Sequence, residues 1–244
     1  MIFEQLFEPQ SCTYTYFLAD QASKEALLID PVLEEIPTYL SLLERYEVKL
    51  ALAVDTHLHA DHITGLGGLQ DTTNCAISMG KYTKAQCLSY IFKEGDYLHF
   101  GKQRLKVLYT PGHTNDSYSF LLSDRVFTGD TLLINGTGRT DFQSGDAVQQ
   151  YDSLFNKLLC LDDEIKVYPA HDYNGKTVST IKEQKVTNPR LQVKNCDEYV
   201  EIMNNLKLSP PNRIDDAIPA NVMLGRDAPL ISERYTQNKS TSYS

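Results

Sequence analysis

The 244-residue chain lacks several features that would point to a membrane or a nucleic acid. No apolar run approaches the roughly 20 residues that a bilayer-spanning helix needs. The formal net charge is −9, so the basic surface by which proteins bind nucleic acid or anionic lipid is not expected. An acidic average of this kind is still compatible with a locally basic pocket for a small anion.

The chain also shows no targeting segment and no disulfide pattern. The N-terminal sequence MIFEQLFEPQ is acidic and lacks the basic and apolar regions of a signal peptide. The cysteines are scattered and never form a C-x-x-C pair, which is typical of reduced thiols. They are Cys12, Cys75, Cys87, Cys160 and Cys196. We therefore expect a cytoplasmic protein.

Hydrophobic periodicity predicts an α+β fold. Apolar and β-branched runs predict strands at about 12–20, 26–30, 49–54, 76–79, 96–100, 104–109, 118–122, 125–129 and 166–169. Helical spacing predicts helices over about 33–43 and 146–161, and further helices from about 179 and 197. Several adjacent strands lack an intervening helix, which favours a four-layer αββα sandwich over a doubly wound parallel sheet.

The predicted elements are not divided by any linker. There is no internal repeat and no Pro/Gly-rich segment that would separate two domains. We expect a single domain over residues 1–235. The polar tail 236–244 has little to bury and is expected to fray.

Five of the six histidines lie in three short polar loops, each directly after a predicted strand. These are His57, His59 and His62 in the first loop, His113 in the second and His171 in the third. Strand ends fix the backbone direction, so side chains just beyond them can converge on a metal. In an extended segment, His57 and His59 project to the same side. His99 fits no cluster, and a structural role is expected for it.

Two aspartates accompany these histidines. Asp61 shares the first loop, and Asp130 follows a strand and a glycine in the sequence FTGDT. A single loop histidine is usually a solvated or hydrogen-bonded residue. Burying so many polar groups together without a metal or a proton task would be costly. The pattern therefore predicts a metal site.

The same residues carry a resemblance to a known family. T-H-L-H-A-D-H, with later G-H-T, T-G-D and A-H-D loops, resembles the metallo-β-lactamase superfamily, which has the αββα fold. Longer segments are similar to the persulfide dioxygenases, also called sulfur dioxygenases. These are FEPQSCTYTYFLAD, HADHITG, TPGHT, FTGDTLLINGTGRTDFQSG and YPAHDYNGKTVSTIKEQKVTNPRL, from about residue 7 to 191, with IPANVM at 218–223.

The resemblance implies two alternative metal sites. In hydrolytic relatives such as glyoxalase II, two metals would share seven ligands. The set is His57, His59 and His113 for one ion, Asp61, His62 and His171 for the other, and Asp130 as the bridge. In the persulfide dioxygenases, the family pattern implies one Fe(II) on His57, His113 and Asp130. All seven side chains are present in this chain, so ligand presence does not discriminate between the two.

In the dioxygenase alternative, the remaining four residues surround the metal ligands, orient them and handle protons. They are His59, Asp61, His62 and His171. Two imidazoles and one carboxylate leave positions open for substrate and O₂, and iron, unlike zinc, supports redox chemistry. The resemblance then implies oxidation of glutathione persulfide by O₂ and water to sulfite and glutathione.

The flanking segments favour this dioxygenase interpretation. GRTDFQSG and HDYNGKTVSTI are similar to the dioxygenase branch, and about 70 residues beyond His171 leave little room for the helical substrate domain of glyoxalase II. The alternatives are a dinuclear metallohydrolase of glutathione thioesters and a non-catalytic metal-binding protein. Glutathione carries carboxylates, and Arg139 is the best candidate to bind one, ahead of Tyr173 and Lys176. A homodimer is expected from the resemblance alone.

Overall fold

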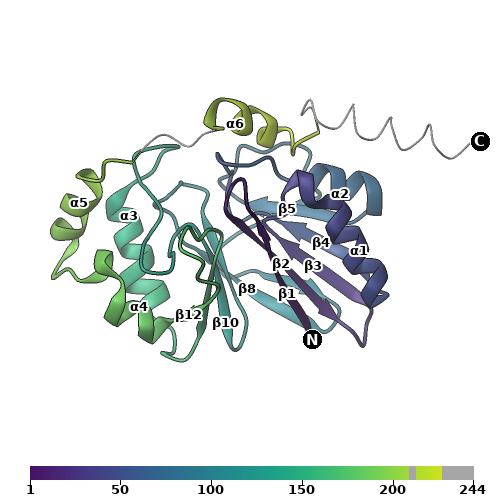
Figure 1. The fold of residues 1–244 in the computed structure, drawn as a ribbon, viewed down its shortest axis with the longest axis horizontal. Coiled ribbons are helices and arrows are strands. Elements are labelled where there is room, and N and C mark those ends of the chain that lie inside the picture. Colours follow the sequence, from purple (N-terminus) through teal and green to yellow (C-terminus); the bar gives the residue numbers. More distant parts are fainter. Residues whose placement is uncertain (209–212, 227–244) are drawn as a thin grey trace, which may run out of the picture.

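The computed structural model describes residues 1–208 and 213–226. The predicted polar tail, 236–244, lies outside the described residues, as do residues 227–235 of the predicted domain. Two six-stranded mixed sheets face each other, and helices cover the outer face of each sheet (Figure 1). The predicted four-layer αββα sandwich is therefore confirmed.

The first sheet contains the N-terminal strands in sequence order. They are β1 (Ile2–Glu8), β2 (Thr13–Asp20), β3 (Glu25–Ile29), β4 (Lys49–Val54), β5 (Ala76–Gly80) and β6 (Tyr90–Phe92). The first three pair antiparallel and the last four pair parallel. The helices α1 (Ile36–Tyr46) and α2 (Leu66–Thr73) cover its outer face (Figure 1).

The second sheet has the order β12-β11-β10-β9-β8-β7. Its strands are β7 (Tyr97–Phe100), β8 (Gln103–Tyr109), β9 (Tyr118–Leu121), β10 (Arg125–Gly129), β11 (Lys166–Pro169) and β12 (Ser179–Thr180). The helices α3 (Ala147–Asp152), α4 (Ile181–Thr187) and α5 (Cys196–Asn204) lie outside it, and α6 (Ile214–Val222) lies across one end of the sandwich (Figure 1).

Three hydrophobic clusters fill the three spaces between the four layers. Strand β2 shows how one strand serves two of them, because every residue in it is buried. Phe17 and Ala19 pack toward α1 and α2, whereas Tyr16 and Leu18 pack toward the second sheet. Side chains that alternate between the two faces thus anchor β2 in both clusters, which fixes the register of the strand and the position of the loops at its ends.

The helical segment predicted over 146–161 differs in detail. Asp146 accepts hydrogen bonds from the amides of Val148 and Gln149 and begins α3, but a π-helical turn follows at Ser153–Lys157. The wider turn shifts the inward face, so Leu154 is buried. Val148, in the first turn of α3, is 56% exposed.

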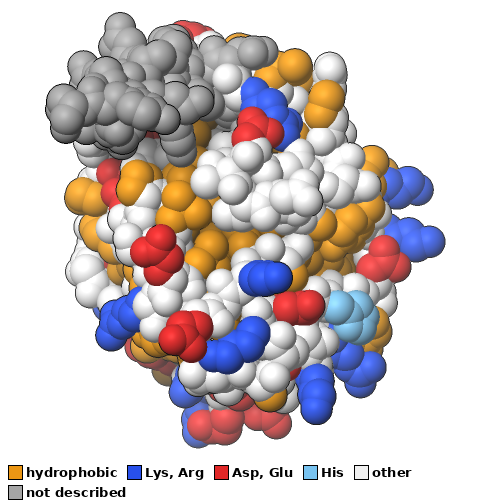
Figure 2. Space-filling view, turned by 90° about the vertical axis from the view of Figure 1, so that its right-hand side faces the viewer, with side chains coloured by type: hydrophobic (Ala, Val, Ile, Leu, Met, Phe, Trp, Pro, Cys, Tyr) orange, Lys and Arg blue, Asp and Glu red, His pale blue; other side chains and the backbone are white. Residues whose placement is uncertain are grey.

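The outer surface carries charges of both signs. Figure 2 shows Lys, Arg, Asp and Glu side chains interspersed with hydrophobic ones on one face of the molecule. Within the described part of the chain, no helix is long and apolar enough to cross a membrane.

Candidate metal centre

The predicted ligands come from loops that follow strands of both sheets. His57 follows β4 of the first sheet, whereas His113 and Asp130 follow β8 and β10 of the second. The ligand atoms of these three side chains all lie within 4.8 Å of one another. That spacing fits donors that each bind one ion at about 2.0–2.2 Å. The structure thus brings together the three residues that the sequence singled out.

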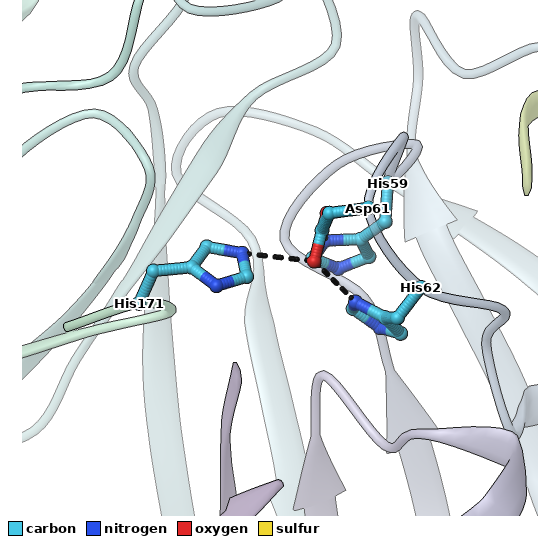
Figure 3. Close-up of side chains that lie close together, drawn as sticks. All are labelled: His59, Asp61, His62 and His171. Carbon is cyan, nitrogen blue, oxygen red and sulfur yellow. Dashed lines mark hydrogen bonds and ion pairs between the residues drawn. The ribbon is translucent and has the colours of Figure 1, made fainter. Parts of the chain in front are cut away.

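A second group of side chains lies beside the first. His59, Asp61, His62 and His171 also have ligand atoms within 4.8 Å of one another, and Figure 3 shows Asp61 between the two imidazoles of His62 and His171. Asp61 Oδ2 lies 2.9 Å from His62 Nδ1 and 3.3 Å from His171 Nε2. Residues predicted to surround the first group are therefore assembled around one carboxylate.

The two groups are in contact. The ring centroids of His57 and His59 are 4.1 Å apart, and those of His57 and His113 are 5.0 Å apart. His171 Nε2 lies 3.7 Å from Asp130 Oδ1. All seven side chains predicted for this region therefore form one continuous cluster between the ends of the two sheets.

Each of three imidazoles is fixed by a hydrogen bond on the side away from the cluster. His113 Nδ1 lies 2.7 Å from the carbonyl oxygen of Arg139, and His171 Nδ1 lies 3.2 Å from that of Cys12. A carbonyl only accepts, so each of these nitrogens is a donor and Nε2 keeps its lone pair when the ring is neutral. His59 instead donates from Nε2 to Asp30 Oδ1 at 3.1 Å, which leaves Nδ1 as its acceptor atom.

Several polar atoms of the cluster are buried without a hydrogen-bond partner in the protein. They are His59 Nδ1, His62 Nε2, Asp130 Oδ1 and His171 Nε2. Buried polar atoms without partners are costly, and a metal ion removes that cost by binding lone pairs. Imidazole nitrogens and carboxylate oxygens suit iron as well as zinc. The donor set therefore fits a metal, and the tautomers described above orient it.

Burial sets the protonation of the imidazoles. It lowers the pKa of His57 and His59 well below the usual value, and neighbouring imidazoles lower it further. Both rings are neutral at pH 7 and available as ligands. Burial also disfavours the charged form of His171, but the carboxylates of Asp130 and Asp61 outweigh this effect and raise its pKa to about 9. In the absence of a metal, His171 is therefore protonated and paired with those carboxylates.

A cavity of about 680 Å³ opens onto the cluster. Five residues of the two groups line it: His113, Asp130, Asp61, His62 and His171. Arg139 and Tyr173, predicted to contact substrate, also line it. Tyr173 is 68% exposed and its ring stacks on that of His171, with centroids 6.1 Å apart.

The guanidinium of Arg139 is bound by a neighbour in the loop. Its Nε and Nη2 donate to the two carboxylate oxygens of Asp141 at 2.7 and 2.8 Å, and the group lies over the ring of Phe142. The fork that was expected to bind a substrate carboxylate is thus occupied by a carboxylate of the protein. Arg139 O, by contrast, accepts the hydrogen bond that orients His113.

Lys176 is not among the residues that line the cavity. Its backbone N–H donates to Asp172 Oδ2 at 2.7 Å, and its carbonyl oxygen accepts from the hydroxyl of Tyr14. The backbone of Lys176 thus belongs to a loop that is held by hydrogen bonds to the Asp172 carboxylate. That Lys176 contacts substrate stays a prediction.

Two supporting residues were not identified from the sequence. Asp30 accepts hydrogen bonds from His59 and from the amide and hydroxyl of Thr56, next to His57. Asn221, in α6, donates to the carbonyl oxygens of His59 and His62. For Asn221 the signal in the sequence was the similarity of IPANVM, which contains it, whereas Asp30 lies in no segment singled out for the site.

The chain matches the model of the Metallo-beta-lactamase superfamily over residues 12–87 and 90–171. It is 46% identical to the mitochondrial persulfide dioxygenase ETHE1 of Mus musculus, with 94% of this chain and 91% of that protein covered. The crystal structure of ETHE1 from Myxococcus xanthus superimposes with a TM-score of 0.90 at 48% identity, covering 92% of this chain and all of that one.

Similarity to hydrolases is weaker and shorter. The hydroxyacylglutathione hydrolase of Francisella tularensis subsp. novicida is 34% identical over 66% of this chain and 63% of its own length. The resemblance seen in the sequence is thereby confirmed. The chain belongs to the metallo-β-lactamase superfamily and, within it, to the family of the persulfide dioxygenases.

Proposed function

We propose that this chain is an iron-dependent dioxygenase that oxidises glutathione persulfide with O₂ and water to sulfite and glutathione. One observation carries the proposal: His57, His113 and Asp130 converge at a cavity in a chain 46% identical to a persulfide dioxygenase over 94% of its length. Two imidazoles and one carboxylate are the ligand set of many non-heme iron oxygenases.

The overall reaction balances without a further reductant. Glutathione persulfide, O₂ and water give glutathione, sulfite and two protons. The terminal sulfur loses four electrons, which reduce both atoms of O₂, and the bond between the two sulfurs breaks. One Fe(II) ion per chain, held by His57, His113 and Asp130, would supply the open positions and redox chemistry for this reaction.

The protein's own residues prepare the site for that ion. Burial keeps His57 neutral, so that its lone pair is available at pH 7. The Arg139 carbonyl oxygen orients His113, and the peptide N–H of Gly138 donates to the carbonyl oxygen of Asp130 at 2.7 Å. These bonds hold two of the three ligands from the same segment of chain, which reduces the reorganisation needed to bind metal.

The surrounding group holds protons and orients the ligands. His171 lies close to both Asp61 and Asp130, at 3.3 and 3.7 Å. In the proposed mononuclear centre, Asp61, His62 and His171 lie outside the coordination sphere and hold the ligands in place through these contacts.

A dinuclear hydrolase acting on glutathione thioesters is the second candidate. It is favoured by the second group itself, since His59, Asp61, His62 and His171 have the geometry to hold an ion and include unpartnered nitrogens. The higher identity and longer coverage of the persulfide dioxygenases weigh against it.

Two further expectations stay predictions. The mammalian relatives are described as mitochondrial, whereas a cytoplasmic location was expected for this chain. A homodimer was expected from the resemblance, and gel filtration with light scattering would measure it.

Turnover with and without O₂ tests the proposed function. The iron-loaded protein is incubated with glutathione persulfide in air and under argon, and sulfite is measured. We expect sulfite in air, one per O₂ consumed, and none under argon. Release of glutathione from S-lactoylglutathione, without sulfite from the persulfide, would replace the proposal with the hydrolase.

A further inference from the structure

The main chain of Leu58, which lies between His57 and His59, is bound on both sides by side chains from distant segments. Its N–H donates to Asp116 Oδ2 at 3.1 Å, and its carbonyl oxygen accepts from Gln143 Nε2 at 2.7 Å. These two hydrogen bonds form the Leu58 clamp. The backbone between two histidines of the first loop is therefore fixed by two residues that the sequence did not single out for the site.

The Leu58 clamp connects the first sheet to two segments of the second sheet. One side of it is the loop after β4, which carries His57. Asp116 lies three residues after the ligand histidine in the loop between β8 and β9, and Gln143 lies in the loop that begins at Asp130 after β10. The clamp therefore joins the three loops from which the three predicted metal ligands come.

The first of these loops depends on side chains for its conformation. In the described structure, residues 55–63 belong to no helix or strand. Their main chain is bound largely by side chains, such as Asp30 at the N–H of Thr56 and Asn221 at two carbonyl oxygens. Leu58 is buried, so its N–H and its carbonyl oxygen both need partners within the protein. Loss of either partner is therefore expected to displace the loop.

Close packing alone does not hold Leu58 in place. A second cavity of about 230 Å³ lies beside it, and Leu58, Asp116 and Gln143 are among the residues that line this cavity. Gln143 also lines the larger cavity at the metal centre, so it contributes to the walls of both. A main chain next to a cavity has room to shift, in contrast to one within a close-packed interior. The two hydrogen bonds are thus needed to fix it.

The backbone at Gln143 is strained. Gln143 has a φ of 49° and Ser144 a φ of 62°, and both values lie in the left-handed region that residues with a side chain rarely adopt. The turn is tied to the residue before a predicted ligand, because the N–H of Asp146 donates to the carbonyl oxygen of Gly112 at 2.8 Å. Strain of this kind is concentrated at functional sites. Here the strained turn presents the Gln143 side chain to the clamp.

We propose that Asp116 and Gln143 are positioning residues, which set the place of His57 relative to His113 and Asp130 by clamping the main chain of Leu58. A metal ion requires its ligands to meet within narrow limits of distance, and one of these ligands comes from a different sheet from the other two. The inference rests on the proposed function only in taking these three side chains as the ligands of one ion. It does not depend on the reaction that the ion supports.

A purely structural role is the competing explanation. Asp116 and Gln143 would then stabilise the fold, and their loss would lower the free energy of unfolding. The metal affinity and the ligand geometry of the folded protein would stay unchanged. Positioning predicts instead that both metal properties change in variants that remain folded.

Binding of Co(II) alone tests the clamp, because Co(II) accepts imidazole and carboxylate ligands and its visible absorption depends on their geometry. Asp116→Ala and Gln143→Leu each remove one hydrogen bond, and each is expected to lower Co(II) affinity about 10- to 100-fold in competition with a chelator. Asp116→Asn keeps an oxygen that can accept from Leu58 and is expected to regain most of the affinity. Asp162→Ala is the matched control, because its carboxylate accepts the N–H of Glu164 on the surface at 2.9 Å, and it is expected to bind Co(II) like the wild type.

The visible spectrum of the Co(II)-saturated protein separates positioning from a structural role. Both single variants are expected to show an altered spectrum, with the fold verified by circular dichroism; if Asp116→Ala does not fold, Gln143→Leu carries the test. The double variant is expected to lose little more affinity than either single one, because release of one side already frees the main chain of Leu58.

Three results would overturn the proposal. They are wild-type affinity and spectrum in the folded single variants, a loss of stability with both metal properties unchanged, and losses of affinity that multiply in the double variant. Because Co(II) binding requires no turnover, a wild type that produces no sulfite would count against the proposed function alone.

Discussion

The hydroxyl oxygen of Thr56 lies 3.0 Å from Nδ1 of His57. The same hydroxyl donates its hydrogen to Asp30 Oδ2 at 3.0 Å, so it can only accept from His57. His57 therefore carries its proton on Nδ1 and keeps the Nε2 lone pair for a metal. The hydrogen bonds that connect Asp30, Thr56 and His57 orient the His57 ring, as the hydrogen-bond partners of metal-binding histidines do in other metal sites.

Replacing Thr56 by valine keeps the shape of the side chain but removes the hydroxyl. The N–H of Thr56 still donates to Asp30, so the loop is expected to keep its course. Without an acceptor for His57 Nδ1, iron affinity is expected to fall about 10- to 100-fold. Competition with a chelator measures the change. Thr56→Ser restores the hydroxyl and is expected to bind iron like the wild type; equal affinities for all three proteins would contradict this account.

Asn221 connects α6 to the metal-binding loop. Its amide donates to the carbonyl oxygens of His59 and His62 at 2.9 and 2.8 Å and accepts from the N–H of Thr64 at 2.9 Å, and the residue is 2% exposed. Asn221→Ala would leave three buried backbone groups without partners. We expect a loss of about 2–4 kcal/mol in the free energy of unfolding. Urea unfolding measures it, and a loss below about 0.5 kcal/mol would refute the assigned role.

The stability of the metal-free protein is expected to depend on pH through His171. The pKa of this group is raised from 6.5 to about 9 in the folded state, because the carboxylates of Asp130 and Asp61 outweigh burial. The folded state thus binds the proton more tightly than the unfolded state. The stabilisation is complete below about pH 6.5 and is lost as the pH rises through 9.

Urea unfolding in the presence of a chelator measures this dependence. Between pH 6.5 and 9 the wild type is expected to lose on the order of 1–3 kcal/mol of stability. His171→Gln removes the titrating group, so its stability is expected to vary less over this range. If the variant and the wild type showed the same dependence, another group would be responsible.

His113→Ala removes one proposed ligand and is expected to abolish both iron binding and sulfite production. The alanine fits the site sterically, so the fold is expected to persist, and circular dichroism would verify this. His99→Ala serves as the matched control, because His99 lies exposed on β7 outside the cluster. Full iron content in His113→Ala would mean that the ligand assignment is wrong.

The convergence of the predicted side chains could be foreseen because each of their loops directly follows a strand. Strand ends can be recognised from local periodicity, and the sandwich fold brings such ends together. His57, His113 and Asp130 therefore converge as expected. The helix α2 was not predicted, because LGGLQDTT contains weak helix formers. Tertiary packing stabilises it instead, because Leu66 and Leu69 are buried. Glycine at position 68 lets the helix approach Ile36 closely, since a Cβ there would lie 2.6 Å from the Ile36 side chain.

The partners of charged side chains could not be predicted in the same way. Arg139 occurs in a loop rich in polar residues, and the sequence favoured it as the contact for a substrate carboxylate. Its pairing with Asp141 depends on the conformation of the loop, which brings the two side chains together. Such contacts arise from tertiary structure, which local patterns do not encode.

Iron stoichiometry, measured together with O₂ uptake, tests the central claim most directly. The purified protein is loaded with Fe(II), freed of excess metal, analysed for metal content and then given glutathione persulfide in an oxygen electrode. We predict about one iron per chain and immediate O₂ consumption. Two metal ions per chain with no O₂ consumption would contradict the claim that His57, His113 and Asp130 hold a single redox-active ion.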